Sequence, residues 1–208
     1  MSPAYLDVLP AVLAHAGGTS PRATDALVRA DDDALMLQVG RGDPQAYRAL
    51  AERYLAGIVR YATRMLGQQA EAEDVAQETF LRLWREAGRY EARGHKPSTW
   101  LYRVAHNLCV DRLRKARPES VPDEQLASER TSAPLIQREL SEHVTAALAN
   151  LPERQRAAIA LVHYEEKTLE EAGLVLGCAA SAVESLLARG RRSLREQLAA
   201  FYRDGDGR

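Results

Sequence analysis

The chain has 208 residues, of which 46% are hydrophobic and 27% charged, and its formal net charge at pH 7 is −1. This length predicts one large domain or two small ones, and the apolar content is sufficient for a folded core. A net charge near zero excludes a general attraction to nucleic acid, so DNA binding requires local separation of charge. Alanine, leucine, arginine and glutamate dominate the sequence, which favours an all-helical fold.

The chemistry of the side chains argues against an enzyme. The two cysteines, Cys109 and Cys178, are too few for a disulfide framework and are typical of reduced thiols in a cytoplasmic protein. The histidines show no ligand spacing with them, so we predict no metal and no cofactor. The sequence contains neither a P-loop nor a nucleophile–base pair, so we predict no small-molecule substrate. No apolar run approaches the roughly 20 residues that span a bilayer, so we predict no membrane insertion.

Residues 1–30 form an N-terminal extension with an apolar patch that is interrupted by Pro10 and by Gly17 and Gly18. The proline and the glycines limit any helix to a short turn. The segment is either a mobile extension, or a translation start placed too early, or it docks onto a regulator or onto the rest of the protein.

Residues 31–67 contain two patterns of helical period. Aspartates from Asp31 suit the N-terminus of the first helix, which stops at Gly40 to Gly42. Asp43 and Pro44 are the N-cap and first-turn proline of the second, which ends at Gly67. Their apolar stripes, which predict hydrophobic core and not a cofactor site, are Leu35, Met36, Val39, Tyr47, Leu50, Tyr54, Ile58 and Tyr61.

The next helix is acidic. At 100° per residue its predicted core face contains Ala72, Val75, Ala76, Thr79 and Leu83. The opposite face carries Asp74, Gln77, Glu78, Leu81 and Arg85. A leucine in the middle of a polar face is either a stray surface residue or part of a protein-binding surface rimmed by carboxylates.

A connection from Gly88 to Ser98 leads into a basic helix, which we predict from about Ser98 to Lys115. Ser98 or Thr99 is its expected N-cap, with Pro97 just before it. Its core face is Leu101, Val104, Ala105 and Leu108, and a second stripe holds Arg103, Asn107 and Arg114 beside Trp100 and Tyr102. These side chains suit phosphates and unstacked bases, although helix arginines are more often simply solvated.

Residues 118–139 mix proline, serine and acid with little periodicity, which predicts a flexible acidic linker. A second domain, residues 140–204, follows with an apolar stripe from Leu140 to Leu151. It then shows a helix–turn–helix pattern, with a helix from Leu169 to Leu176, a turn at Gly177 and a second helix from about Ala180. A generic three-helix hairpin is the alternative.

The second helix of this pattern has two distinct sides. Its expected buried side is Val183, Leu187, Gly190, Leu194, Leu198 and Phe201, and Ser181, Ser185, Arg189 and Arg192 point away from it. A recognition helix places such a polar face in the major groove.

The motifs resemble one known family. DVAQETFLRLW (74–84) followed by STWLYRVAHNLCVDRLRK (98–115) closely resembles region 2 of bacterial sigma factors of the extracytoplasmic-function (ECF) class. LPERQRAAIALVHYEEKTLEEAGLVLGCAASAVESLLARGRRSLRE (151–196) resembles their region 4. The resemblance implies that residues 31–117 are region 2 and residues 140–204 are region 4. The implied partners are core RNA polymerase (β′ clamp helices and β subunit), promoter DNA and an anti-sigma factor.

The resemblance also implies residue roles. Polymerase binding falls to Asp74, Gln77, Glu78, Leu81 and Arg85. Contacts to the promoter −10 element fall to Arg93, His95, Lys96, Ser98, Trp100, Arg103, Asn107, Arg112, Arg114 and Lys115. Contacts to the −35 element fall to Ser181, Ser185, Arg189, Arg192 and Arg195. The family's linker passes through the RNA exit path of the polymerase, where the acids of residues 118–139 either mimic RNA or serve as a plain spacer.

The chain departs from the family pattern at two places. Glu184 and Leu186 stand where basic residues are usual, and Ala172-Gly173 stands where Ile-Ala is common. Glycine inside a helix costs about 1 kcal/mol, and two lost phosphate contacts lower the salt slope of binding by about two units. We therefore expect altered −35 specificity or weaker duplex affinity.

Two other functions fit part of the sequence. A stand-alone helix–turn–helix regulator explains the second domain but gives the acidic helix no role. A decoy that mimics a sigma domain has no need of the basic residues in both domains.

Overall fold

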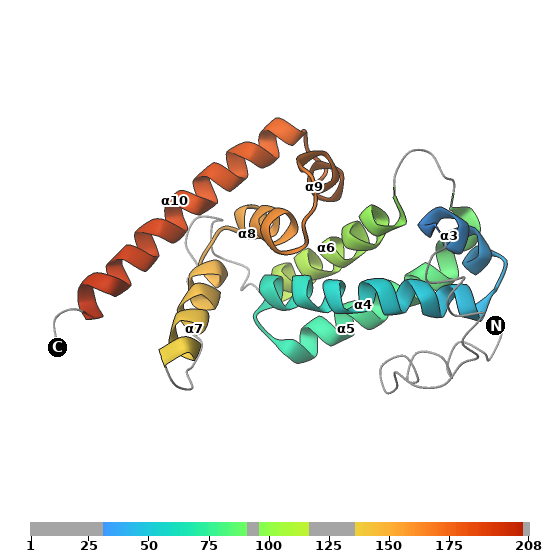
Figure 1. Cartoon of the computed structure of the whole chain (residues 1–208), viewed down its shortest axis with the longest axis horizontal. Helices are drawn as coiled ribbons and strands as arrows, with labels where there is room; N and C mark the ends of the chain where they lie inside the picture. Colours follow the sequence, from blue (N-terminus) through green and yellow to red (C-terminus); the bar gives the residue numbers. More distant parts are fainter. Residues whose placement is uncertain (1–30, 91–95, 117–135, 206–208) are drawn as a thin grey trace.

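The computed structural model describes residues 31–90, 96–116 and 136–205, and every regular element in these ranges is a helix (Figure 1). The helices are α3 (Asp32–Gly40), α4 (Pro44–Leu66), α5 (Gln69–Glu86), a 3-10 turn η1 (Ala87–Arg89), α6 (Pro97–Ala116), α7 (Ile136–Ala149), α8 (Glu153–Ile159), a π-helix η2 (Ala160–Tyr164), α9 (Leu169–Leu176) and α10 (Ala180–Gly205). The predicted all-α fold is confirmed.

Local chemistry sets the limits of α4 as predicted. The Asp43 carboxylate accepts hydrogen bonds from the backbone N–H groups of Gln45 (2.8 Å) and Ala46 (3.4 Å), and Pro44 occupies the first turn. These contacts satisfy donors that a helix N-terminus leaves unpaired. At the other end Gly67 adopts the left-handed conformation (φ 73°), which glycine allows at no steric cost.

The first domain packs α3, α5 and α6 around α4. The predicted stripe of α4 is buried except for Tyr54, which is half-buried and donates its hydroxyl to Asp32. Tyr47 is 1% exposed and meets the rings of Phe80 and Trp84 edge-on. Phe80 is fully buried but was absent from the predicted core face of α5, since on the wheel it lies at the edge of that face.

The basic helix begins one residue earlier than predicted. Pro97 is its first residue, and the backbone N–H groups of Thr99 and Trp100 donate to the Lys96 carbonyl. Ser98 and Thr99 therefore lie inside the first turn, each 4% exposed, and the prediction that one of them is the N-cap is wrong. Proline is itself a common first helical residue, so Pro97 is the first residue of α6 and not the residue that precedes the helix.

The second domain consists of α7 to α10, and α7 begins at Ile136, before the predicted domain start at residue 140. The helix–turn–helix has the predicted limits. Thr168 and Glu171 form a reciprocal capping box at the start of α9, and Gly177 ends it with φ 63°.

Gly173 is required by the turn. A Cβ added to it would lie 2.6 Å from the backbone oxygen of Cys178, whose N–H donates to the Gly173 carbonyl at 2.9 Å. The expectation that this glycine only weakens the helix is therefore corrected, because close backbone approach excludes any side chain at this position.

The two domains are in contact. In Figure 1, α9 lies beside α6 and the connection from α8 to α9 approaches α4, while α10 lies at the outer edge of the second domain. The buried apolar residues of both domains form one cluster.

Within the described ranges no single helix is long and apolar enough to cross a membrane. The pair Leu169–Leu176 with Ala180–Ala199, which is the helix–turn–helix, reaches the required length and composition together but is bent by 93°.

Candidate polymerase- and DNA-binding surfaces

The five residues predicted to bind the polymerase lie outside the hydrophobic core, on the side of α5 opposite Val75 and Leu83. Asp74 and Arg85 are exposed, and Gln77, Glu78 and Leu81 are half-buried. We call this set the acidic face (Asp74, Gln77, Glu78, Leu81 and Arg85). The other side of α5 is buried against the domain, and the acidic face presents Leu81 one turn after Glu78 and one turn before Arg85.

The basic residues of α6 form a second surface. Arg103, Asn107, Arg114 and Lys115 are exposed, whereas Trp100 and Arg112 are half-buried. Arg114 donates to the Asp111 carboxylate at 2.9 Å, an exposed pair that costs little to break. The helix therefore displays cations and an amide along one side, which is the arrangement that contacts phosphates.

Two polar residues of α6 do not belong to this surface. Ser98 is buried in the first turn and is not part of the exposed surface, and its assignment as a −10 contact stays a prediction. Tyr102, expected beside the basic stripe, is 3% exposed and packs edge-on against Tyr61 with ring centroids 5.8 Å apart. The residues of α6 have the predicted helical spacing, but the helix is rotated about its axis so that Ser98 and Tyr102 face the protein interior.

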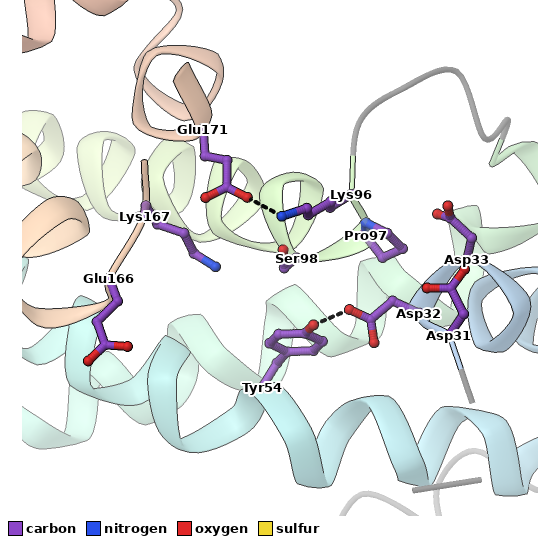
Figure 2. A pocket seen from close by; sticks show the side chains of 10 residues that line it. All are labelled: Asp31, Asp32, Asp33, Tyr54, Lys96, Pro97, Ser98, Glu166, Lys167 and Glu171. Atoms are coloured by element: carbon purple, nitrogen blue, oxygen red, sulfur yellow. Dashed lines mark hydrogen bonds and ion pairs between the residues drawn. The ribbon is translucent and has the colours of Figure 1, made fainter. Parts of the chain in front are cut away.

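Lys96 lies at the beginning of α6 and faces the second domain. Its ammonium is 2.8 Å from the Glu171 carboxylate of α9. Figure 2 shows both side chains at an open cleft of about 440 Å³, which is also lined by Asp31, Asp32, Asp33 and Lys167. The hydrogen bond raises the pKa of Lys96 and lowers the pKa of Glu171. Arg93 and His95, the other predicted residues of this loop, lie outside the described residues.

The polar side of α10 forms the third surface. Ser181, Ser185, Arg189, Arg192 and Arg195 are all exposed, and Val183, Leu187 and Gly190 are buried on the other side. The Ser185 hydroxyl donates to the Ser181 carbonyl, and the Arg189 Nε donates to the Ser185 carbonyl. The helix thus presents its polar side chains outward in the way that a recognition helix requires.

The two residues of α10 that stand where the family usually has basic residues lie in different environments. Glu184 is exposed beside Ser185, but Leu186 is 8% exposed and belongs to the core. A basic residue at position 186 would not reach DNA in this fold. Only one cationic contact is therefore replaced, and the expected decrease in salt slope becomes about one unit.

No periodic pattern in the sequence predicts the group of residues that lies at the contact between the domains. Glu165 is buried, and its carboxylate accepts hydrogen bonds from Tyr102 (2.7 Å) and Arg60 (3.1 Å) of the first domain. Glu165 directly follows η2 and is the first of two consecutive glutamates, and such residues are usually solvated.

The comparisons with known proteins agree with this architecture. Residues 50–119 match the family model for sigma-70 region 2, and residues 141–194 match that for sigma-70 region 4. The ECF RNA polymerase sigma factor SigW of Bacillus subtilis is 33% identical over 175 residues, covering 77% of this chain and 93% of SigW. The RNA polymerase sigma-H factor of Pseudomonas aeruginosa is 28% identical over 194 residues, covering 86% and 99%.

Solved structures show the same fold. CnrH, in complex with the cytosolic domain of CnrY, has a TM-score of 0.65 at 24% identity, over 81% of this chain and 97% of CnrH. The sigma factor RpoE from Bartonella quintana, in complex with the anti-sigma factor NepR, has a TM-score of 0.58 at 24% identity, over 74% and 96%. Together with the two matched regions and the identity to SigW, these results show that the chain belongs to the ECF family of RNA polymerase sigma factors.

Proposed function

We propose that this ECF sigma factor binds core RNA polymerase through the acidic face of α5 and then reads a promoter with α6 and α10. The observation that supports the proposal most directly is the division of charge within one domain. The acidic face and the basic residues Arg103, Asn107 and Arg114 lie on adjacent helices, and both are held by the same core. Surfaces of opposite charge suit two different partners, a protein and a phosphate backbone.

The −10 element is read by the loop before α6 and by α6 itself. Trp100, half-buried at the start of the helix, supplies an aromatic ring for stacking with an unstacked base, and the arginines hold the backbone. Opening a base step costs a few kcal/mol, and capture of the unstacked base offsets this cost. The chain acts by binding in this proposal, with no covalent chemistry and no cofactor.

The −35 element is read by Ser181, Ser185, Arg189, Arg192 and Arg195. With a net charge of −1, the free protein binds DNA weakly. On the polymerase the two domains are held at a fixed spacing, and their modest affinities combine through effective concentration. The linker, residues 118–139, connects the two domains, and residues 1–30 remain an extension outside these roles.

We also propose an anti-sigma factor as a partner and the cytoplasm as the location. In the two structures of similar fold, CnrH is bound to the cytosolic domain of CnrY, and the sigma factor RpoE is bound to the anti-sigma factor NepR. A protein of this kind would inhibit the chain by covering the acidic face or the DNA-binding surfaces.

Run-off transcription on fragmented genomic DNA, with sequencing of the start sites, tests the function. Core polymerase with this protein should produce transcripts from a set of promoters that share −10 and −35 sequences. A stand-alone helix–turn–helix regulator would bind duplex DNA without the polymerase and would yield no transcripts.

The double variant Asp74→Arg, Leu81→Glu tests the acidic face. It should abolish binding to core polymerase and leave the circular dichroism spectrum unchanged, since both residues lie outside the core. Glu86→Arg, an exposed change of the same sign at the end of α5, is the control. Equal co-purification of the β′ subunit with all three proteins would reject this assignment.

A further inference from the structure

The first turns of α10 carry a single charged side chain. From Ala180 to Ala188 the helix consists of alanine, serine, valine and leucine apart from Glu184, and the first cation along it is Arg189. In a helix–turn–helix protein these first turns enter the major groove and contact the edges of the bases. In the proposed docking, the charged group nearest the bases is therefore a carboxylate, although DNA is usually contacted by cations.

Glu184 lies on the outward side of α10. It is exposed, as are Ser181 and Ser185, which belong to the proposed −35 surface. Residues three and four apart are neighbours on the surface of a helix. The neighbours of Glu184 at this spacing that are not buried are Ala180, Ser181 and Ala188, and all three have short side chains. The Glu184 side chain therefore extends beyond the surface around it.

The other polar groups of these turns contact the helix itself. The Ser185 hydroxyl donates to the Ser181 carbonyl at 3.1 Å, and the Arg189 Nε donates to the Ser185 carbonyl at 3.2 Å. Within the ranges that the structure describes, no hydrogen bond or ion pair involves the Glu184 carboxylate. Its oxygens are therefore open to a donor outside the chain.

The major groove offers such a donor on only some bases. An ionised carboxylate only accepts hydrogen bonds. Cytosine presents the N4 amino group, which donates, whereas guanine presents two acceptors and thymine presents an acceptor and a methyl group. Adenine presents a donor next to an acceptor. Phosphate oxygens repel a carboxylate, so Glu184 gains nothing from the DNA backbone. Among these groups, cytosine N4 is the best match.

We propose that Glu184 is a specificity-determining residue, whose carboxylate accepts a hydrogen bond from the N4 amino group of a cytosine in the −35 element. This inference rests on the proposed function, because it requires α10 to lie in the major groove of that element. The same carboxylate rejects guanine and thymine, since a desolvated charge that faces an acceptor is costly. The exposed Arg192 and Arg195 supply positive charge that offsets the repulsion between Glu184 and the phosphates.

Three variants change the chemistry at this one position. Glu184→Gln keeps the shape of the side chain and adds a donor beside an acceptor, which matches N6 and N7 of adenine. Glu184→Arg provides donors alone, which match O6 and N7 of guanine. Glu184→Ala removes the polar group. Glu196→Gln is the matched control, because it removes the same charge from an exposed position further along α10.

The measurement is run-off transcription by core polymerase with each protein on a promoter library. The −10 element is kept fixed, the −35 element is randomised, and a barcode in the transcribed region identifies each sequence. At one position of one strand, the wild type should select cytosine over guanine by about tenfold. Glu184→Gln should change this preference to adenine, Glu184→Arg should change it to guanine, and Glu184→Ala should abolish it. The other positions, and the control, should keep the wild-type pattern.

Three outcomes overturn the inference while transcription proceeds. If Glu184→Gln raises transcription equally from every −35 sequence, the carboxylate only repels phosphate. If no position distinguishes the variants from the wild type, Glu184 does not contact DNA. If the position that responds does not select cytosine in the wild type, the assigned base is wrong. If the wild type yields no transcript from any library member, the proposed function itself fails. Circular dichroism should be the same for all five proteins, because both substituted positions are exposed.

Discussion

His106 lies on the buried side of α6, and burial keeps its imidazole neutral at pH 7. It is 8% exposed, and its Nδ1 is 2.9 Å from the Tyr61 hydroxyl. Burial, with a smaller effect of the positive charge of Arg154, lowers the pKa of His106 from 6.5 to about 4. The helix that carries Arg103 and Asn107 therefore rests on a neutral hydrogen-bonded pair.

This pair predicts a pH dependence of stability. The pKa of His106 is lower in the folded state than in the unfolded state, so the unfolded chain takes up the proton first as pH falls. The stabilisation is complete above pH 6.5 and is lost as pH falls toward 4. We expect the wild type to lose up to about 3 kcal/mol more than His106→Gln over this range, in urea unfolding at each pH.

The control for this measurement is His163→Gln, which changes an exposed histidine in the second domain. Its pH profile should follow that of the wild type. If His106→Gln also follows the wild type, the neutral state of His106 does not contribute to folding.

For Gly173→Ala we expect a change in stability opposite in sign to the change that helix propensity alone predicts. Alanine at an unconstrained helix position would stabilise by about 1 kcal/mol. At position 173 its Cβ would meet the backbone oxygen of Cys178 at 2.6 Å, and backbone cannot move aside cheaply. We expect Gly173→Ala to destabilise by about 1–3 kcal/mol, measured by denaturant unfolding. Leu174→Ala, at the exposed neighbouring position, controls for the loss of a side chain on α9. A stabilised Gly173→Ala would show that the turn adapts.

At the scale of single elements, the ends of a helix could be predicted from the sequence where a capping side chain or a glycine determines the backbone conformation. Asp43 and Gly67 delimit α4, and Thr168 and Gly177 delimit α9, as the sequence predicts. The π-helix η2 was not predicted, because its extra residue per turn shifts the faces of the helix without a residue type that signals it. Ser98, Tyr102 and Leu186 were misplaced for a related reason, since exposure depends on the rotation of a helix against its neighbours.

Recognition by α10 gives a prediction for one side chain of that helix. Arg189 is exposed in the middle of the polar side of α10, one turn after Ser185. If it contacts a base, Arg189→Ala should lower −35-dependent transcription by an amount that corresponds to roughly 1–3 kcal/mol. Arg41→Ala, an exposed arginine of the first domain outside the proposed DNA-binding residues, is the control. A loss that is equal on every −35 sequence would assign Arg189 to phosphate instead.

At the scale of the whole molecule, the docking of the two domains could not be predicted. Glu165 is separated by 63 residues from Tyr102 and by 105 from Arg60, so no periodic pattern connects these residues. The sequence predicted two domains and a linker, and the linker, residues 118–139, lies mostly outside the described residues. The sequence does not show which polar side chains pair between the two domains, because such pairing depends on their positions in three dimensions.

Arg156 also connects the two domains, and it determines how the molecule unfolds. Its guanidinium donates to the backbone carbonyl of Met65 at the end of α4 (2.6 Å) and to those of Ala149 (2.6 Å) and Leu151 (3.1 Å) in the second domain. Because these bonds and the shared apolar cluster link the domains, calorimetry of the wild type should show one cooperative transition.

Arg156→Lys keeps the charge, but a single ammonium does not reach all three carbonyls in this geometry. We expect the variant to lose about 2–4 kcal/mol, to unfold about 5–10 °C lower, and to show a second, separate transition. Arg154→Lys is the control, because Arg154 is exposed and donates only a 3.4 Å bond to the Leu176 carbonyl within its own domain. Two transitions already present in the wild type would show that the domains unfold independently and that Arg156 does not couple them.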